Sequence, residues 1–581
     1  MINAALRHRP ESEDCFLYDQ EHLRLRFHSA SGDIASVTVL YGDPYWNLPS
    51  ADGRYVFQYE QQAMTKLGTG EALDHWACTL TAPFARMQYL FLVTDKAGVS
   101  VLVGDRGIRA DSQENRLEVS NYFRVPYFHA IDMVQTPDWV KQTVWYQIFP
   151  ERFANGDQTN DPANTKPWRP ADHPGREDFY GGDLHGVLDH LDDLQALGIN
   201  GLYFCPIFTA SSNHKYDTID YLEIDPAFGD KALFAKLVTE AHARGMKIML
   251  DAVFNHMGYE SMQWQDVLAN GAKSRFASWF HIHEFPVTPF RDPIHDGGKP
   301  QFDTFGFEPH MPKLNTANPE VQDYLLSVAK YWVEEFDIDA WRLDVANEVD
   351  HHFWRRFYAA VTAIKPDFYV LGEVWHSSQP WLNGGEFSGV MNYAYTQLTM
   401  DHFLTHKQSA QELVERLTDQ LMLYRDQVNQ VMLNMLDSHD TARLLTQAGD
   451  DQDLALQTLA FIFTQTGAPC IYYGTEMGMD GDNDPDDRRP MDWSKLGGKT
   501  WQKVAALIKV RRDHAATFGQ GSTALTVTDT GLIKVERSGE QHITAYFNTT
   551  DREIKLTATP VLAQNFQANV LAPKGFVVSV D

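Results

Sequence analysis

Between residues 144 and 476 the chain alternates eight times between short apolar runs and stretches with the period of an amphipathic helix. The runs are VWYQIFP, INGLYFCPI, KIMLDAVFNH, IDAWRLDV, DFYVLGEVW, FSGVMNY, QVMLNMLDSHD and GAPCIYYGTE. Continuous apolar runs are typical of parallel strands buried on both faces, and the stretches between them predict helices that cover such a sheet. Eight repeats of strand and helix favour a (β/α)8 TIM barrel over a doubly wound sheet.

Two stretches between the runs carry signals for where a helix begins and ends. DKALFAKLVTEAHARG predicts a helix with Asp230 as its N-cap and Gly245 just beyond its end. HGVLDHLDDLQALG predicts another helix, which is closed by Gly198. Both lie where a parallel barrel requires a crossover helix between strands.

The segments on either side of this region have a different pattern. Residues 1–125 contain no long stretch of helical period, and HLRLRFHS alternates apolar and polar side chains as a half-buried strand does. Beyond the barrel, GLIKVER and HITAYFN return to alternation. We therefore expect an N-terminal β-sandwich over 1–125, the barrel over 126–515 and a C-terminal antiparallel β domain over 516–581.

The third and fourth predicted strands are further apart than the others. Asp251 and Asp344 are separated by 93 residues, whereas Asp344 and Glu373 are separated by 29. The excess includes FHIHEFPVTPFRDPIHDGGKPQFDTFGFEPHMPKLN, which has no clear period and is rich in Pro, His and aromatic residues. We expect an inserted loop domain after the third strand, at about 257–315, that overhangs the barrel mouth.

Charge and cysteine content narrow the class of protein. Lys plus Arg number 49 against 78 Asp plus Glu, which argues against a nucleic-acid or anionic-membrane partner because both need a basic surface. The four cysteines form no CxxC pair, so neither a zinc nor a redox motif is indicated. The N-terminus lacks the apolar core of a signal peptide, and no apolar stretch approaches the length of a membrane span. We expect a cytoplasmic protein.

Charged side chains stand at the ends of four predicted strands. They are Asp251 in DAVFNH, Arg342 and Asp344 in WRLD, Glu373 in GEVW, and His439 and Asp440 in SHD. Any one of them alone would more often be a helix cap or an ion-pair partner. Because the catalytic groups of such barrels come from the carboxyl ends of several strands, the four together predict a site at that face.

Three converging carboxylates suit the cleavage of a glycosidic bond. One acts as nucleophile, one as general acid and then base, and the third helps to stabilise the oxocarbenium-like transition state. Arg342 lies two residues before Asp344 and so shares its face of the strand, where it would keep that carboxylate ionised. Trp375 and Tyr216, close to strand ends, suit stacking on sugar rings.

DAVFNH, WRLDVANEV, GEVW and SHD, in this order and spacing, resemble the four motif regions of the α-amylase family of glycoside hydrolases. MPKLN, WYQIFPERFANGD and the β-rich N-terminal region resemble its cyclomaltodextrinase, neopullulanase and maltogenic amylase subfamily. The resemblance covers essentially the whole chain and implies a carbohydrate-binding-module-like N-terminal domain. It also implies retaining hydrolysis, with some transglycosylation, of α-1,4-glucosidic bonds in cyclodextrins, pullulan and maltooligosaccharides.

The resemblance implies roles for individual residues. Asp344 matches the nucleophile, Glu373 the proton donor and Asp440 the carboxylate that stabilises the transition state. The expected substrate contacts are His214, Tyr216, His256, Arg342, Glu348, Trp375, His439, Asp484 and Arg488. For Asp484 and Arg488 the alternative is a solvated charged loop.

A calcium site is implied by a further match. FANGDQTND and GGD match the calcium loop of the subfamily, with oxygen donors of the kind that Ca²⁺ prefers. The matching positions are Asn155, Asp157, Asn160, Asp161, Gly181 and Asp183. An ordinary Asx turn is the alternative, because Asn-Gly-Asp is favourable turn sequence.

In the subfamily that the chain resembles, the N-terminal domain covers the active site of the partner subunit in a homodimer. YGDPYWN matches the tip of that domain, so Tyr45 is expected to contribute to the neighbour's substrate cleft. The alternative is a turn aromatic that packs locally.

Two other functions stay open at this point. One is an exo-acting oligo-1,6- or α-glucosidase on the same scaffold, against which MPKLN and the N-terminal domain argue. The other is an inactive glycan-binding barrel, which need not retain Asp344, Glu373 and Asp440.

Overall fold

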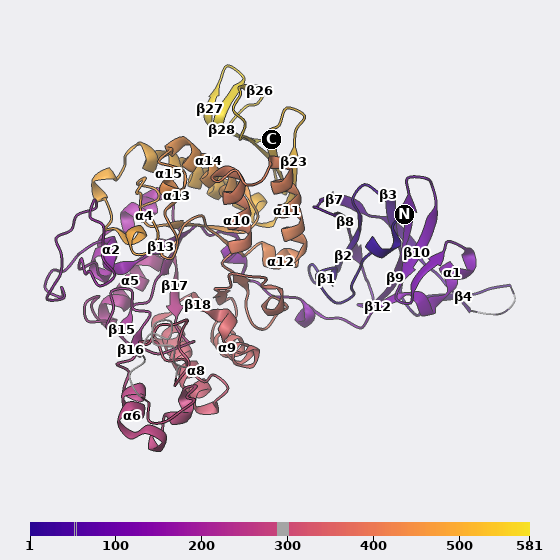
Figure 1. The fold of residues 1–581 in the computed structure, drawn as a ribbon. Coiled ribbons are helices and arrows are strands. Elements are labelled where there is room, and N and C mark those ends of the chain that lie inside the picture. Colours follow the sequence, from indigo (N-terminus) through magenta and orange to yellow (C-terminus); the bar gives the residue numbers. More distant parts are fainter. Residues whose placement is uncertain (52, 54, 288–300) are drawn as a thin grey trace.

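The computed structural model describes residues 1–51, 53, 55–287 and 301–581, and its central part is a parallel β-barrel (Figure 1). Eight strands of these residues pair in the order β20-β19-β18-β17-β14-β13-β22-β21. They are, in chain order, β13 (Trp145–Ile148), β14 (Gly201–Phe204), β17 (Lys247–Ala252), β18 (Ala340–Leu343), β19 (Tyr369–Gly372), β20 (Gly389–Val390), β21 (Leu433–Asn434) and β22 (Ala468–Tyr472). A parallel bridge between Met391 and Leu433 joins the two ends of the sheet. The predicted barrel is therefore confirmed.

Helices surround these strands, as the alternation predicts. They include α3 (Leu184–Asp189), α4 (Leu191–Leu197), α5 (Lys231–Ala243), α8 (Pro319–Phe336), α9 (His351–Ile364), α10 (Tyr393–Phe403), α11 (Ala410–Met422), α12 (Asp426–Asn429), α14 (Gln452–Thr464) and α15 (Lys499–Asp513). Asp230 caps α5 by accepting from the Leu233 N–H, as predicted. The predicted end at Gly198 is confirmed, because Gly198 caps α4 with φ +103°, but the single predicted helix is wrong. It is interrupted at His190, whose ring stacks on Trp493 with 3.5 Å between the ring centres.

The N-terminal part is a sandwich of two antiparallel sheets, as predicted. One sheet has the order β1-β2-β8-β7 and the other β11-β10-β9-β3-β6, with β12 on β9. Their bounds are β1 (Cys15–Leu17), β2 (His22–Ala30), β3 (Ile34–Gly42), β6 (Glu60–Ala63), β7 (Thr65–Thr69), β8 (Leu73–Thr81), β9 (Met87–Asp95), β10 (Ser100–Gly104), β11 (Gly107–Ala110) and β12 (Phe123–Val125). Between the sheets lies an apolar core that includes Leu25, Phe27 and Phe91.

The alternating pattern of β2 gives only part of its environment, because its polar face is covered as well. Arg26 is fully buried and donates to the Tyr424 carbonyl at 2.8 Å and to Asp426 at 2.5 Å, next to α12 of the barrel. In Figure 1, β1, β2 and β7 face α11 and α12. The polar face of this sheet is therefore the surface that docks the N-terminal domain on the barrel.

Four titratable groups form a continuous chain across the same docking surface. Asp14 contacts His28 Nε2 at 2.7 Å, His28 Nδ1 contacts His75 Nδ1 at 2.8 Å, and His75 Nε2 contacts Asp419 of α11 at 2.7 Å. Burial raises the pKa of Asp14, but the hydrogen bond and charge of His28 outweigh it and hold that pKa below its ordinary value. Burial also raises the pKa of Asp419, and its hydrogen bonds, first that with His75, outweigh this and lower it, so both carboxylates of this line are acceptors.

The insertion after β17 forms a small unit of its own. It contains α6 (Met262–Asn270) and isolated antiparallel bridges, of which one joins His256 to Lys313 and another Phe280 to Leu314. Residues 288–300 of the predicted 257–315 segment lie outside the described residues. Phe305 and Met311 of this unit line the central pocket, so the insertion overhangs the barrel mouth as predicted.

The C-terminal part is an antiparallel sheet of β23 (Ser522–Val527), β24 (Ile533–Ser538), β25 (His542–Asn548), β26 (Ile554–Lys555), β27 (Leu562–Gln567) and β28 (Val570–Val580). It packs on the barrel through α14, where Phe461 and Phe547 lie 5.3 Å apart. Across the described ranges, none of the helices has both the length and the apolar character needed to cross a bilayer.

Candidate active site

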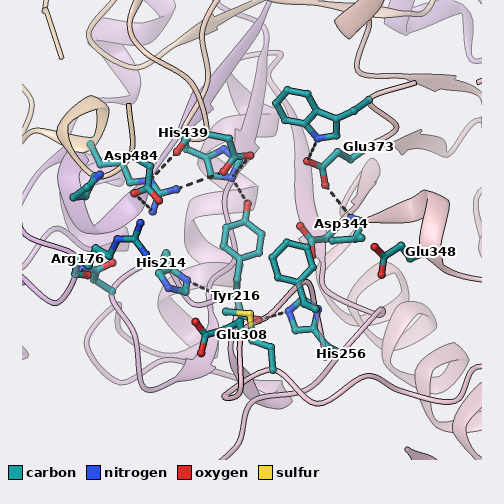
Figure 2. Close-up of a pocket in the computed structure, with 18 of the residues that line it drawn as sticks. Arg176, His214, Tyr216, His256, Glu308, Asp344, Glu348, Glu373, His439 and Asp484 are labelled. Carbon is teal, nitrogen blue, oxygen red and sulfur yellow. Dashed lines mark hydrogen bonds and ion pairs between the residues drawn. The ribbon is translucent and has the colours of Figure 1, made fainter. Parts of the chain in front are cut away.

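A pocket of about 510 Å³ opens at the carboxyl ends of the barrel strands (Figure 2). Predicted residues that line it are His214, Tyr216, His256, Asp344, Glu348, Glu373, Trp375, His439, Asp440, Asp484 and Arg488. They come from segments far apart in the chain, because parallel strands all end at the same face of the barrel. The structure thus brings the predicted catalytic groups and almost all predicted substrate contacts into one cavity.

One guanidinium joins the acidic groups at the strand ends. Arg342 of β18 is fully buried, and its Nη1 donates to Asp251 Oδ1 at 2.9 Å and to Asp344 Oδ1 at 2.8 Å. Its Nη2 forms an ion pair with Glu373 Oε2 at 2.9 Å. Because a guanidinium presents its donors in a fixed plane, Arg342 sets the relative positions of all three carboxylates.

Glu373 at the end of β19 is held by two further donors. The Val345 N–H donates to its Oε2 at 2.9 Å, and Trp375 Nε1 donates to its Oε1 at 3.0 Å. Val345 has φ +45°, a left-handed conformation that is costly for a β-branched residue and that is found mostly at functional sites. Trp375 stacks on Tyr393 at 3.7 Å. The Glu373 carboxyl is thus fixed in the pocket from three directions.

Burial and like charges raise the proton affinity of this cluster. Burial raises the pKa of Asp344; Arg342 opposes the rise, and the charge of Glu373 adds to it. Burial likewise raises the pKa of Asp251 to about 6 against the opposing charge of Arg342. Protons on such a cluster belong to the coupled set, so its titration is a property of the group.

Asp251 was noted at a strand end but not assigned a role from the sequence. It is the register partner of Arg342 between β17 and β18, and it also accepts from Tyr216 Oη at 2.9 Å. Its side chain is completely buried and does not line the pocket. The parallel register of the two strands is the signal that could have assigned it as the support of Arg342.

Three histidines of the pocket, His214, His256 and His439, are neutral groups. Burial, followed by the charge of Arg488, lowers the pKa of His214 to about 3, and burial lowers that of His256 to about 3. Burial and the charges of Arg488 and Arg342 lower the pKa of His439 well below its ordinary value. These residues can therefore donate or accept single hydrogen bonds to a sugar without bringing a positive charge.

Asp440 is joined to the pocket wall by two neighbours. His439 Nε2 lies 3.2 Å from Asp440 Oδ2, and Arg488 Nη2 lies 3.4 Å from Asp440 Oδ1. Arg488 also pairs with Asp484 at 2.9 Å and is mostly buried. The alternative of a solvated loop for Asp484 and Arg488 does not describe this arrangement, since both line the pocket.

Glu348, another predicted substrate contact, lies at the opposite wall of the pocket. Lys313 contacts its Oε2 at 3.2 Å and also contacts Asn255 Oδ1. Lys313 comes from the MPKLN segment, so the inserted unit fixes this edge of the pocket. Glu348 keeps a partly exposed carboxylate toward the cavity (Figure 2).

Two predicted substrate contacts do not line the pocket: Arg342, which is fully buried against Asp344 and Glu373, and Tyr45. Tyr45 lies in the N-terminal domain just before β4 (Asn47–Pro49), is 76% exposed, and has the Arg86 guanidinium 4.6 Å from its ring centre. Figure 1 places β4 on the side of this domain away from the barrel. Within one chain, Tyr45 therefore does not reach the substrate.

The predicted calcium loop is compact and rich in oxygen. Asn155 Oδ1 and Asn160 Oδ1 are buried and have no hydrogen-bond partner, and a Cβ on Gly181 would lie 2.2 Å from Asp161 Oδ1. Asp183 caps α3 and accepts from the Asp157 N–H at 2.9 Å. Among the residues that the structure describes, no three His, Cys, Asp or Glu side chains alone could hold a metal, so amide and backbone oxygens would have to contribute.

Several pocket residues were not predicted from the sequence. They are Arg152, Arg176, Asn213, Phe305, Glu308, Met311, Val345, Asn347, His376 and Pro485. Most of them lie on irregular loops, where no periodic pattern shows which side chains point inward. Asn347 and Val345 are the exceptions, since both adjoin Asp344 within the WRLDVANE motif.

The geometry suits acid–base and nucleophilic chemistry at one carbon. Two carboxylates, Asp344 and Glu373, lie on the same guanidinium at the pocket floor, and a third, Asp440, lies across the pocket. Such a set can attack a sugar, protonate its leaving group and stabilise a positive transition state. The exposed ring of Trp375 offers a surface for a sugar.

Comparison with known proteins also points to an enzyme that cleaves glycosidic bonds. The alpha amylase catalytic-domain model matches residues 147–518, and the alpha amylase N-terminal ig-like domain model matches residues 1–129. The chain is 47% identical to an intracellular maltogenic amylase of Bacillus subtilis over 552 residues, which are 94% of this chain and 91% of that protein. It is 43% identical to a cyclomaltodextrinase of Geobacillus thermopakistaniensis, covering 100% of this chain and 97% of that protein.

A solved structure has the same fold over the full length. It is a cyclomaltodextrinase that superposes with a TM-score of 0.88 at 40% identity, covering 100% of this chain and 98% of that chain. The catalytic model, these relatives and the carboxylate cluster on Arg342 agree, and the chain belongs to the α-amylase family of glycoside hydrolases.

Proposed function

We propose that the protein hydrolyses α-1,4-glucosidic bonds in cyclodextrins, pullulan and maltooligosaccharides with retention of configuration, and with some transglycosylation. The observation that carries the proposal is the placement of Asp344 and Glu373 on the single guanidinium of Arg342 at the pocket floor. The names of the relatives, a maltogenic amylase and cyclomaltodextrinases, support these substrates.

The first half of the reaction uses both carboxyl groups. The Asp344 carboxylate attacks the anomeric carbon while the Glu373 carboxyl gives its proton to the departing glycosidic oxygen, so a glycosyl ester forms and the bond to the leaving sugar breaks. Asp440 faces the developing positive charge. In the second half the Glu373 carboxylate takes a proton from water, which attacks the ester and frees Asp344. A sugar hydroxyl in place of water gives transfer.

The surroundings of Glu373 suit this exchange of protons. After it has given up its proton, the carboxylate is stabilised by the Val345 N–H, the Trp375 indole and Arg342. Before that step, the crowding of three carboxylates around one cation favours one retained proton in the cluster. Glu373 is the member that can pass this proton to the leaving oxygen.

The pH dependence of kcat/KM should change in a defined direction in Asp251→Asn. Activity is present while Asp344 is ionised and is lost as pH falls through its pKa, which the charge of Asp251 helps to raise. Removing that charge is expected to move the acid limb to lower pH, with about a tenfold lower plateau because a charged support of Arg342 is lost. A pH profile of cyclodextrin hydrolysis measures both effects.

Asp339→Asn is the matched control for this measurement. Asp339 is equally buried but lies outside the pocket, where it binds Lys247, Lys365 and His242. Its replacement should leave the acid limb where it is in the wild type. An acid limb that stays in place or moves to higher pH in Asp251→Asn would contradict this electrostatic account.

Product chromatography from β-cyclodextrin, pullulan and soluble starch tests the proposal as a whole. Maltose from cyclodextrin, or panose from pullulan, is the expected result. Glucose as the only early product from short oligosaccharides would instead indicate the exo-acting oligo-1,6- or α-glucosidase. No turnover of any glucan would revive the inactive glycan-binding barrel.

We also propose that the loop of residues 155–183 binds Ca²⁺. The donors would be Asn155, Asp157, Asn160, Asp161, Gly181 and Asp183, which supply carboxylate, amide and backbone oxygens of the kind this ion prefers. The unpartnered amide oxygens support this, as does Asp161, whose pKa burial raises, with Asp183 and Asp157 adding to the rise. Bound Ca²⁺ would tie the segment after β13 to the N-terminus of α3.

Calcium is expected to stabilise the protein against unfolding. At a concentration of 100 Kd it should add about 2.7 kcal/mol, because a ligand that binds only the folded state shifts the equilibrium by mass action. Titration calorimetry and melting curves with CaCl2 or EDTA measure this. Asp161→Asn keeps the side-chain size and the α3 cap but should bind far more weakly; equal binding by this variant would contradict the site.

We further propose a homodimer in which the N-terminal domain of one copy covers the pocket of the other. The support is a set of exposed apolar side chains of that domain, Tyr45, Tyr55 and Phe84 at 76%, 74% and 59% exposure, of which Tyr45 and Phe84 both contact Arg86. Analytical ultracentrifugation should give a dimer for the wild type and a monomer for Tyr45→Asp/Phe84→Asp. Ile131→Asp, at another exposed apolar residue, is the control that should remain dimeric.

A cytoplasmic location is proposed on a narrower basis. The Bacillus subtilis relative is named an intracellular enzyme. Activity in the cytosolic fraction of cells that make the protein is the expected result, and activity confined to the culture medium would contradict it.

A further inference from the structure

Gln147 lies behind the pocket and contacts one residue of the pocket wall, His439. It belongs to β13, is 1% exposed and does not line the cavity. The amide nitrogen Nε2 of Gln147 lies 2.7 Å from Nδ1 of His439 and 3.8 Å from Sγ of Cys205. A polar side chain in an otherwise apolar barrel strand needs such a partner.

The other nitrogen of His439 faces acceptors. Nε2 lies 2.6 Å from Tyr216 Oη and 3.2 Å from Asp440 Oδ2. The Tyr216 hydroxyl proton is directed to the Asp251 carboxylate at 2.9 Å, which leaves its oxygen free to accept. A carboxylate and an accepting phenol oxygen both require a proton on Nε2.

His439 has one ring proton to place. Burial and the charges of Arg342 and Arg488 lower its pKa, so the ring is neutral. With that single proton on Nε2, the bare Nδ1 needs a donor, and the Gln147 amide is the group that stands there. The other titratable groups that face His439 are Asp440, Tyr216 and His214.

We propose that Gln147 is a positioning residue that holds His439 in its Nε2-protonated neutral form, so that this N–H faces the pocket and Asp440. The inference rests on the proposed function, since it gives His439 a donor role toward the substrate and toward the transition-state carboxylate. Gln147 itself touches no reacting atom; it selects which of two ring forms the pocket contains.

Two replacements of Gln147 separate this role from a packing role. Gln147→Met keeps the length but cannot donate, and it is expected to lower kcat about tenfold with little change in KM, as when a buried acceptor loses its donor. Gln147→Glu keeps the shape but offers an acceptor to Nδ1. In its neutral form His439 would then carry its single ring proton on Nδ1, and Nε2, which faces Asp440, would have no proton.

Gln147→Glu is therefore expected to add an ionisation that the Met variant lacks. At lower pH the imidazolium still has an N–H on Nε2 and activity is kept; as pH rises and the ring loses a proton, kcat/KM falls at least tenfold. The double variant Gln147→Glu/His439→Gln should lack this alkaline limb. Gln457→Glu, at an equally buried glutamine against the C-terminal domain, controls for adding a buried carboxylate.

Neutron diffraction from deuterium-exchanged crystals of the wild type tests the proton position directly, without substrate. Deuterium on Nε2 and none on Nδ1 is expected; deuterium on Nδ1 would overturn the proposal, as would a Gln147→Glu profile identical to that of the wild type. Failure of the wild type to cleave any glucan would reject the proposed function and leave the neutron result to decide the role of Gln147.

Discussion

Glu373→Gln is expected to lower kcat on β-cyclodextrin by about 10³-fold, within the range for loss of a general acid–base. The amide keeps the size of the side chain and can still accept from the Val345 N–H, which donates to Glu373 at 2.9 Å. It cannot give a proton to the leaving oxygen or remove one from water. Melting temperature and cyclodextrin binding should therefore stay near those of the wild type while turnover is lost.

A substrate with a good leaving group shows which step has been lost. Maltosyl fluoride needs no proton on its leaving group, so Glu373→Gln should form the glycosyl ester on Asp344 and stop there, and azide should release it as a glycosyl azide of retained α configuration. Asp344→Asn is the paired variant, which should not turn over maltosyl fluoride, with or without azide. If Glu373→Gln turned over cyclodextrin as fast as the wild type, Glu373 would not be the general acid–base.

Arg342→Met is expected to destabilise the protein by about 3–5 kcal/mol at neutral pH, because it leaves buried carboxylates without their counter-charge. Asp251, Asp344 and Glu373 all contact this guanidinium. The pKa values of Asp251 and Asp344, which burial already raises, would rise further without Arg342, so the loss of stability should be smaller at pH 5 than at pH 8. Urea unfolding at the two pH values gives the comparison.

Arg511→Met provides the control for this prediction. Arg511 is also buried, but its guanidinium donates to the carbonyls of Phe463, Gln465 and Gly467. Its replacement should destabilise the protein by an amount that changes little between the two pH values. A pH-independent loss in Arg342→Met would show that packing, and not charge, explains the position.

The barrel and the convergence of its carboxylates could be predicted because each depends on local sequence. Apolar runs mark the strands, and the barrel places every strand end at one face, so Asp344 and Glu373 had to converge. The burial of Arg26 could not be predicted in this way, since its partners on the barrel are about 400 residues away in the chain. The contact of His190, at the break between α3 and α4, with the distant Trp493 likewise has no local sequence signal.

The pocket walls were predicted less completely than its floor. Phe305 and Glu308 come from the inserted unit, and Arg176 comes from another loop that has no regular period. Gln147 is a different case: it lies in a predicted strand, yet nothing in VWYQIFP shows that its amide contacts the ring of His439. Long-range pairing of single polar groups is the information that the sequence pattern does not contain.

The line of groups between the N-terminal domain and α11 fixes the rings of two histidines. Both ring nitrogens of His28 and both of His75 are engaged, in three contacts that run from Asp14 to Asp419. Neither ring can turn without breaking a contact on each of its sides, so the orientation of one ring constrains the orientation of the other. Because only the last contact crosses to the barrel, the position of Asp419 on α11 is coupled through both rings to Asp14 inside the sandwich.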